Sequence, residues 1–154
     1  MPTYTHEWLC QQIVENAQDA MIFADREGII RLWNSGAEAM FGYSPEEALG
    51  QTLDLIIPER LRGRHWEGYN NVMATGVTRY GRELLAVPAI RKDGTRISLE
   101  FTILLMHDAA GERLGAVAII RDVTARWQQE RATKERLAAL EAKVENIGKL
   151  PNSD

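Results

Sequence analysis

Residues 58–76 constrain the fold more than any other stretch, because both ends and the spacing between them predict a single long helix. Pro58 stands where a proline is tolerated in the first helical turn, and Gly76 stands where a glycine ends a helix. Between them, large side chains recur at steps of four, four and three residues and therefore share one face: Leu61, His65, Tyr69 and Val72.

The unusual member of this face is His65. An imidazole that faces a protein core either satisfies a local hydrogen bond or binds something. The other histidines are poorer ligand candidates, because His6 precedes the predicted domain and His107 lies beside Asp108 in a predicted turn. The helix by itself leaves both interpretations of His65 open.

Strand patterns flank this helix on both sides. Residues 19–24 and 29–33 predict a hairpin. Asn34 or Ser35 can cap a short helix that ends at Gly42, and a capping box at residues 44–47 begins a second one that ends at Gly50. A positive φ is expected at both of these glycines. Three strands are predicted after the long helix, at residues 81–89, 95–106 and 115–120. Alternation in the second of these places four apolar residues on one face: Ile97, Leu99, Phe101 and Ile103. This order of strands and helices predicts an α+β fold with an antiparallel sheet.

Two further helices are predicted at the ends of the chain. Residues 5–16 carry an apolar edge around Trp8 and Ile13, and Cys10 is interpreted there as a packing residue. Thr124 is expected to cap a final helix that reaches about residue 147. The second half of this helix carries a seam at alternating three- and four-residue steps: Leu137, Leu140, Val144 and Ile147. Because the seam lasts only about two heptads, it predicts either a coiled-coil homodimer or a helix that folds back on its own domain.

These patterns divide the chain into four parts. Residues 1–17 form a flanking helix, residues 18–124 a single domain, residues 125–148 a C-terminal helix with the coiled-coil seam, and residues 149–154 a frayed tail. We expect a homodimer in which the opening helix shares the interface, because a coil of two heptads is marginal in water.

Composition excludes several classes of protein. The net charge is −4 with basic residues spread along the 154-residue chain, which argues against a nucleic-acid surface. No apolar run is long enough to span a membrane, and one cysteine rules out an intrachain disulfide, so a cytoplasmic protein is expected. The chain shows no catalytic triad order, no phosphate-binding glycine loop and no metal-spaced His/Cys cluster, and it is therefore not predicted to be an enzyme.

Five segments together resemble a PAS domain, in the order and spacing of that family. They are residues 19–23, 28–30 and 33–50, the turn at residues 91–94, and the close at residues 121–124. The resemblance covers roughly residues 10–124. It implies a five-stranded antiparallel sheet, with short helices forming a ligand pocket over one face.

Residues 64–69 resemble the heme-binding PAS domain of FixL-type oxygen-sensing kinases. The proximal iron ligand of that family falls on His65, which makes heme b a candidate cofactor, and Arg79 falls near a position that contacts a propionate. The gas-binding arginine of the family falls on Leu85 here, which predicts weaker stabilisation of dioxygen than of carbon monoxide or nitric oxide. The remaining residues of the expected pocket are Tyr69, Val72, Ile97, Leu99, Phe101, Ile103, Val117 and Ile119.

The resemblance implies a sensory module that binds a small ligand or cofactor and relays its state through a dimeric C-terminal helix. A heme-based sensor of O2, CO or NO is one form of this hypothesis. The alternatives are a sensor of a non-heme metabolite and a ligand-free dimerisation or interaction module. The sequence does not identify the downstream partner. The reactive cysteine of flavin-based light sensors has no counterpart here.

Overall fold

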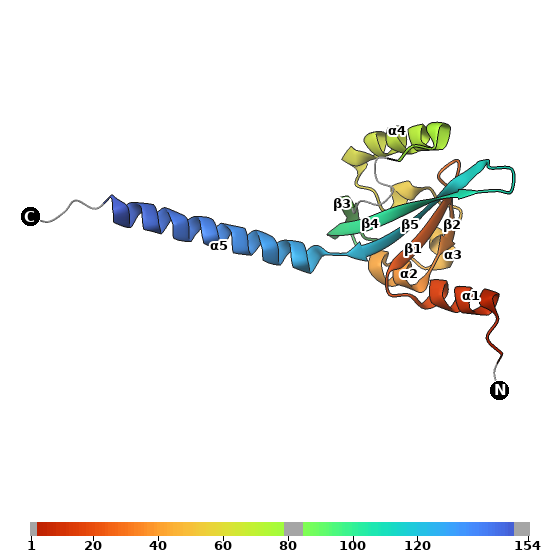
Figure 1. Ribbon diagram of the computed structural model, residues 1–154, viewed down its shortest axis with the longest axis horizontal. Coiled ribbons are helices and arrows are strands. Elements are labelled where there is room, and N and C mark those ends of the chain that lie inside the picture. The colour runs from red at the N-terminus through yellow and green to blue at the C-terminus, as the bar shows by residue number, and fades with distance from the viewer. Residues whose placement is uncertain (1–2, 79–84, 150–154) are drawn as a thin grey trace, which may run out of the picture. The chain divides into compact units, whose positions relative to one another are not determined.

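The computed structural model describes residues 3–78 and 85–149 and divides into two compact units, Met1–Asp122 and Val123–Asp154 (Figure 1). The first unit contains all the strands. Its elements in chain order are α1 (His6–Asn16), β1 (Ala20–Asp25), β2 (Ile30–Trp33), α2 (Ser35–Phe41), α3 (Pro45–Ala48), the 3₁₀ turn η1 (Leu53–Leu55), α4 (Glu59–Thr75), β3 (Leu85–Ile90), β4 (Arg96–His107) and β5 (Arg113–Asp122). The second unit is the helix α5 (Thr124–Gly148).

The five strands form one antiparallel sheet in the order β2-β1-β5-β4-β3. The predicted α+β fold, with a five-stranded antiparallel sheet and helices at both ends of the chain, is confirmed (Figure 1). β1 and β5 are neighbours although about 90 residues separate them, so the two ends of the first unit meet in the middle of the sheet.

Strand register defines the face of the sheet that holds the core. Ile103 pairs with Ala118, which pairs with Ile22, and Phe101 pairs with Ile120. Paired residues lie on the same face of a sheet. The four alternating residues of β4 therefore face the core as predicted. Helices α2 and α3 cover this face, and the buried cluster between helices and sheet includes Ile22, Ile30, Trp33, Phe41, Ala48, Ile97, Leu99 and Ile120.

Val117 and Ile119 lie on the opposite, outer face, which corrects the prediction that they line the pocket with the β4 residues. Val117 pairs with Phe23 and Leu104, and Ile119 pairs with Met21 and Thr102. Side chains alternate between faces with a period of two, so the odd-numbered residues of β5 cannot share a face with Ala118 and Ile120. The prediction failed because β5 is apolar on both faces.

Several helix and strand ends differ in detail from the sequence expectations. Gly42 and Gly50 have positive φ as expected, at +84° and +87°. Thr124 does not cap α5, because it is the first helical residue and Val123 occupies the cap position without a side-chain hydrogen bond. β3 runs through Pro88 instead of ending near it. Its place at the edge of the sheet tolerates a residue without a backbone N–H.

Most apolar residues of the two flanking helices are exposed. α1 has no buried residue, and Cys10 is exposed with its Sγ 3.5 Å from Nε2 of His6, so the expected packing role of this cysteine is wrong. The seam residues of α5 are exposed as well: Leu137, Leu140, Val144 and Ile147. Among the described helices, none is both long enough and apolar enough to cross a bilayer.

Candidate functional site

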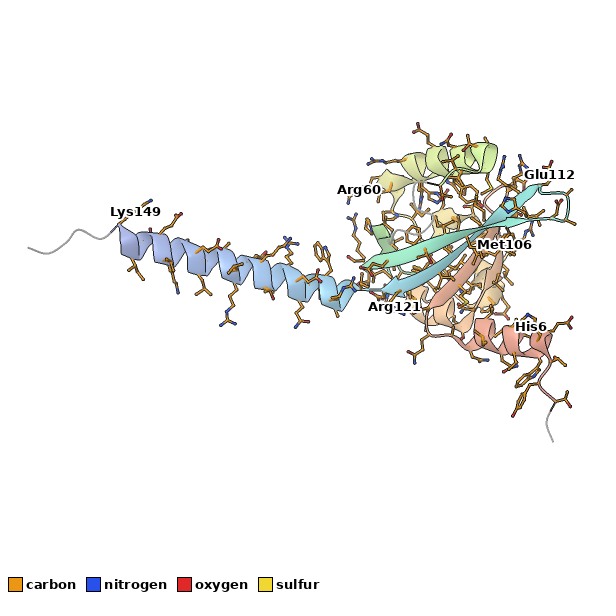
Figure 2. All side chains as sticks on the ribbon, viewed as in Figure 1. His6, Arg60, Met106, Glu112, Arg121 and Lys149 are labelled. Atoms are coloured by element: carbon orange, nitrogen blue, oxygen red, sulfur yellow. The ribbon has the colours of Figure 1, made fainter. Side chains whose placement is uncertain are left out.

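The inner face of α4 carries the candidate site. The predicted stripe is half-buried as a whole: Leu61, His65, Tyr69 and Val72. Three further residues of this face were not predicted: the half-buried Arg62 and Trp66, and Met73, which is the single fully buried residue of α4. They adjoin the stripe by one helical position each, and spacing alone did not separate them from solvent-facing neighbours. Arg60, off this face, is exposed at the start of the helix (Figure 2).

Side-chain hydrogen bonds fix the first half of α4 to the segment around η1. The indole Nε1 of Trp66 donates to Oδ1 of Asp54 at 2.7 Å. Arg62 donates from Nε to the carbonyl of Ile57 at 3.1 Å and from Nη2 to the carbonyl of Asp54 at 3.2 Å. The helix is therefore held here by directional polar contacts, with little deep packing.

The middle of α4 contacts the turn between β1 and β2. The hydroxyl of Tyr69 lies 3.1 Å from the carbonyl oxygen of Ala24 and 2.5 Å from that of Asp25. Burial, together with the charges of Asp25 and Glu27, raises the pKa of Tyr69 to about 12, so the hydroxyl stays protonated and donates. Trp66 lies directly on Gly28, where an added Cβ would stand 2.2 Å from its ring.

The C-terminal end of α4 is held by Arg113 at the start of β5. Its Nε donates to the carbonyl of Met73 at 2.7 Å, and its Nη2 donates to that of Ala74 at 2.8 Å. The last carbonyls of a helix lack partners within the helix, and a cation at this end is also attracted by the partial negative charge of the helix dipole. α4 is thus held against the rest of the first unit at three places along its length.

His65 contacts the two large aromatic residues of this face, which also contact each other, with ring centroids 5.6 Å apart. Its ring centroid is 4.9 Å from that of Trp66 and 5.9 Å from that of Tyr69. Its Nδ1 is buried and has no hydrogen-bond partner among the described residues. Burial lowers the pKa of His65, with the charge of Asp54 acting in the opposite direction. The imidazole is therefore neutral near pH 7, which is the form that coordinates a metal.

This depressed pKa predicts that acid weakens the fold. Below the usual histidine pKa of 6.5 the unfolded chain binds a proton at residue 65 that the folded chain does not bind. The contribution of His65 to stability is therefore present above pH 6.5 and is lost as the pH falls below it. We expect urea unfolding between pH 7.5 and 5.5 to show a smaller loss of stability in His65→Gln than in the wild type. The matched control is the same substitution at the exposed His6.

The other predicted pocket residues are only partly brought together. Ile97 and Leu99 are buried beneath the short helices, whereas Phe101 and Ile103 are half-buried farther along the same face. Leu85 pairs in register with Phe101. Arg79, expected near a propionate, lies outside the described residues.

The donor set fits one axial iron ligand, because His65 is neutral and its buried Nδ1 is unpartnered. The described residues hold no group of three His, Cys, Asp or Glu side chains that could bind a bare metal ion. Two hollows stand out in the first unit, and neither includes a residue of α4. One, of about 460 Å³, lies between the end of α2 and the β3–β4 turn, and the other, of about 190 Å³, lies on the outer face of the sheet.

Comparisons with known proteins place the chain among signalling proteins. Residues 14–128 match the family model described as the PAS fold. The chain is 31% identical over 149 residues to the sensor protein FixL of Bradyrhizobium diazoefficiens, which covers 95% of this chain and 28% of that protein. It is 34% identical over 131 residues to the signal transduction histidine-protein kinase AtoS of Escherichia coli, which covers 83% of this chain and 20% of that protein.

A solved structure supports the same fold. The PAS domain of a protein from Colwellia psychrerythraea aligns with a TM-score of 0.67 at 23% identity, covering 76% of this chain and 96% of that domain. The chain spans less than a third of the length of the two sensor proteins, so it corresponds to one segment of each.

Proposed function

The chain belongs to the PAS family, whose modules occur in signalling proteins such as histidine kinases, and from this premise we propose that the inner face of α4 around His65 is its sensory site. The observation that carries the proposal is the neutral imidazole with a buried, unpartnered Nδ1. A buried polar atom without a partner costs free energy of folding. A ligand that bonds to the imidazole would remove this cost, which supports a binding role for His65.

The cofactor that this site suits best is heme b. His65 would be its axial ligand, and the adjoining rings of Trp66 and Tyr69 would hold the imidazole in position. Phe101 and Ile103 would contribute an apolar wall. A bound heme supplies an open coordination position for a diatomic gas. Because Leu85 stands where the related oxygen sensors have an arginine, dioxygen would lack that donor, and carbon monoxide or nitric oxide would be less affected.

The attachment of α4 is consistent with entry of a flat macrocycle beneath it. Only Met73 of this helix is fully buried, and the other attachments are hydrogen bonds from Arg62, Trp66, Tyr69 and Arg113. A helix held in this way can move outward at a smaller cost than one locked by interdigitated side chains, because water can replace its part-buried hydrogen bonds once it moves.

The test is reconstitution of the full chain with hemin. The wild type is expected to take up one heme per chain and to give a Soret band whose ferrous spectrum changes in His65→Ala. His6→Ala and His107→Ala serve as matched controls and should retain the wild-type spectrum. Failure of the wild type to bind heme stoichiometrically would contradict the proposal that heme is the cofactor. An unchanged ferrous spectrum in His65→Ala would show that a residue other than His65 is the iron ligand.

A sensor of a non-heme metabolite is the second candidate. It is favoured by the filled cluster beneath α2 and α3 and by the absence of α4 residues from the two hollows described above. Native mass spectrometry of the purified chain separates the two candidates, because a retained metabolite adds a mass other than that of heme. A protein without any added mass would favour the ligand-free interaction module.

We further infer that the state of the site is relayed through a homodimer in which α5 takes part. The seam of α5 exposes four aliphatic side chains, which is costly for a helix that remains single: Leu137, Leu140, Val144 and Ile147. An output domain or partner protein would receive the signal from this helix.

A further inference from the structure

The last turn of α4 is attached to the sheet by the side chain of Arg113. Its Nε donates to the carbonyl of Met73 at 2.7 Å, and its Nη2 donates to that of Ala74 at 2.8 Å. The same guanidinium packs against Gly76, which ends the helix with a φ of +72°. A Cβ added to Gly76 would stand 2.8 Å from Nη1 and 3.4 Å from Cζ of Arg113. One side chain therefore covers the end of this helix by hydrogen bonds and by direct contact.

No other hydrogen bond joins this turn to the sheet within the part of the chain that the structure describes. The side chain of Thr75 and the backbone N–H groups of Gly76 and Val77 all bond to residues of α4 itself. The next attachment along the helix is that of Tyr69 to the β1–β2 turn. The position of the last turn thus depends on Arg113 and on the one buried side chain of the helix.

The β4–β5 hairpin positions Arg113 for this contact. The register of β4 and β5 shifts between Met106 and His107, and His107 is the residue that pairs with Arg113. Such irregularities redirect nearby side chains. Arg26 of the β1–β2 turn holds the backbone here, because its Nη1 lies 3.5 Å from the carbonyl oxygen of Arg113 and 3.6 Å from Oε2 of Glu112. Figure 2 shows Glu112 at this hairpin, beside the end of α4.

The guanidinium of Arg113 has no carboxylate partner within residues 3–78 and 85–149. Its partners on α4 are neutral carbonyl oxygens. Water can replace a carbonyl at a smaller cost than it can replace a carboxylate, because hydrogen bonds between two charged groups are the stronger ones. The contact therefore closes the end of the helix and is also reversible.

We propose that α4 is a lid over His65 and that Arg113 is its latch, so that release of the two hydrogen bonds of Arg113 opens the site. The bonds of Arg62 and Trp66 to the segment around η1 keep the first half of the helix in place. The helix can then tilt outward about that fixed end. Local opening takes place where little apolar surface is buried, and only Met73 of α4 is fully buried. The inference rests on the sensory site proposed above, because it describes how a ligand reaches that site.

The lengths along the helix explain why Arg113 has the largest influence on opening. At a rise of 1.5 Å per residue, Met73 lies about 16 Å from Arg62, and Tyr69 lies about 10 Å from it. A tilt about the fixed end displaces Met73 more than Tyr69. The Tyr69 hydroxyl also resists the tilt, but the bonds of Arg113 lie where the displacement is larger and must break first.

Methionine oxidation measures this opening without any ligand. Met73 is buried under the lid, Met40 is buried in the core cluster, and Met106 is 40% exposed. A thioether must be exposed before it reacts with hydrogen peroxide. Peptide mass spectrometry of the three initial rates therefore separates opening of the lid from unfolding of the whole unit. In Arg113→Leu we expect Met73 to react at least tenfold faster than in the wild type, with the rates of Met40 and Met106 unchanged.

Two further variants are compared with Arg113→Leu. Arg113→Lys keeps the charge but loses the fork of donors, so its effect on Met73 should be smaller. Arg121→Leu is the matched control, because Arg121 is an exposed arginine of the same strand whose ion pair is with Asp19, and Met73 should react there as in the wild type. Equal Met73 rates in Arg113→Leu and the wild type would overturn the latch. An acceleration of Met40 as large as that of Met73 would overturn it as well.

Hemin uptake then connects the latch with the proposed site. The full chain carrying Arg113→Leu is expected to take up hemin at least several-fold faster than the wild type. An unchanged rate of uptake, with faster oxidation of Met73, would show that hemin reaches His65 by another route and would overturn the role of the latch in access. Failure of both proteins to bind hemin would contradict heme as the cofactor, whereas the oxidation rates would still decide whether the latch exists.

Discussion

Replacing Asn34 by alanine is expected to lower the free energy of unfolding by about 4 kcal/mol, because four backbone groups, one in a buried and three in part-buried hydrogen bonds, would each lose a partner. Asn34 is 3% exposed. Its Oδ1 accepts from the backbone N–H of Met21 and of Ala37, both at 2.9 Å. Its Nδ2 donates to the carbonyls of Val14 at 2.8 Å and Asp19 at 3.1 Å. One side chain thus joins the end of α1, the start of β1 and the start of α2.

The measurement is urea unfolding at constant m value, compared with two further variants. Asn34→Asp keeps the acceptor but aims a carboxylate at two carbonyls, so it should be at least as unstable as the alanine variant. Asn70→Ala, at an exposed position on α4, should cost no more than about 0.5 kcal/mol. A loss below 1 kcal/mol in Asn34→Ala would mean that water replaces the amide, and that the three elements are joined by packing instead.

The role of Asn34 was only partly predictable from the sequence. Its position before a helical segment predicted it as one of two cap candidates, and it does cap α2. Its bonds to residues 14, 19 and 21 depend on how the chain folds back over itself. No local pattern encodes such a contact, because the spacing rules for caps reach only three residues along the chain.

The two faces of β4 were predictable, and those of β5 were not. In β4 the polar residues Ser98, Glu100 and Thr102 alternate with apolar ones and mark the outer face. Residues 115–120 of β5 contain no polar side chain, so either phase of the alternation fits them. Only the register with β1 and β4 assigns Val117 and Ile119 to the outer face.

The face of α4 was predictable to within one helical position. His65 and Tyr69 face inward, as their spacing indicated. Trp66 was missed because its contact depends on Gly28, which lies 38 residues earlier and leaves room for the indole by having no side chain. A pair of this kind is visible only after the β1–β2 turn has been placed against the helix.

Gly115, like Gly28, makes a close contact that is possible only because it has no side chain. Gly115→Ala is expected to cost about 3 kcal/mol, because overpacking a close contact between strands forces the backbone to shift. An added Cβ would stand 2.1 Å from the carbonyl oxygen of Ala24 and 2.9 Å from the Cα of Asp25. The carbonyl of Ala24 also lies 3.1 Å from the hydroxyl of Tyr69. A shift of β1 away from β5 therefore weakens the attachment of α4 as well as the sheet.

Gly111→Ala in the β4–β5 turn separates this close contact from the general cost of replacing a glycine. Gly111 has a φ of +84° and no heavy atom within 4 Å of the position of an added Cβ, so it should cost only about 1 kcal/mol. The indole fluorescence of Trp66, isolated by changing the other three tryptophans to phenylalanine in both backgrounds, should shift to the red in folded Gly115→Ala and stay unchanged in Gly111→Ala. Equal stability losses with an unshifted spectrum would show that β1 accommodates the methyl group without moving the carbonyl that Tyr69 contacts. In that case, the attachment of α4 would be independent of the sheet beneath it, and a signal at His65 would have to reach β5 by another route.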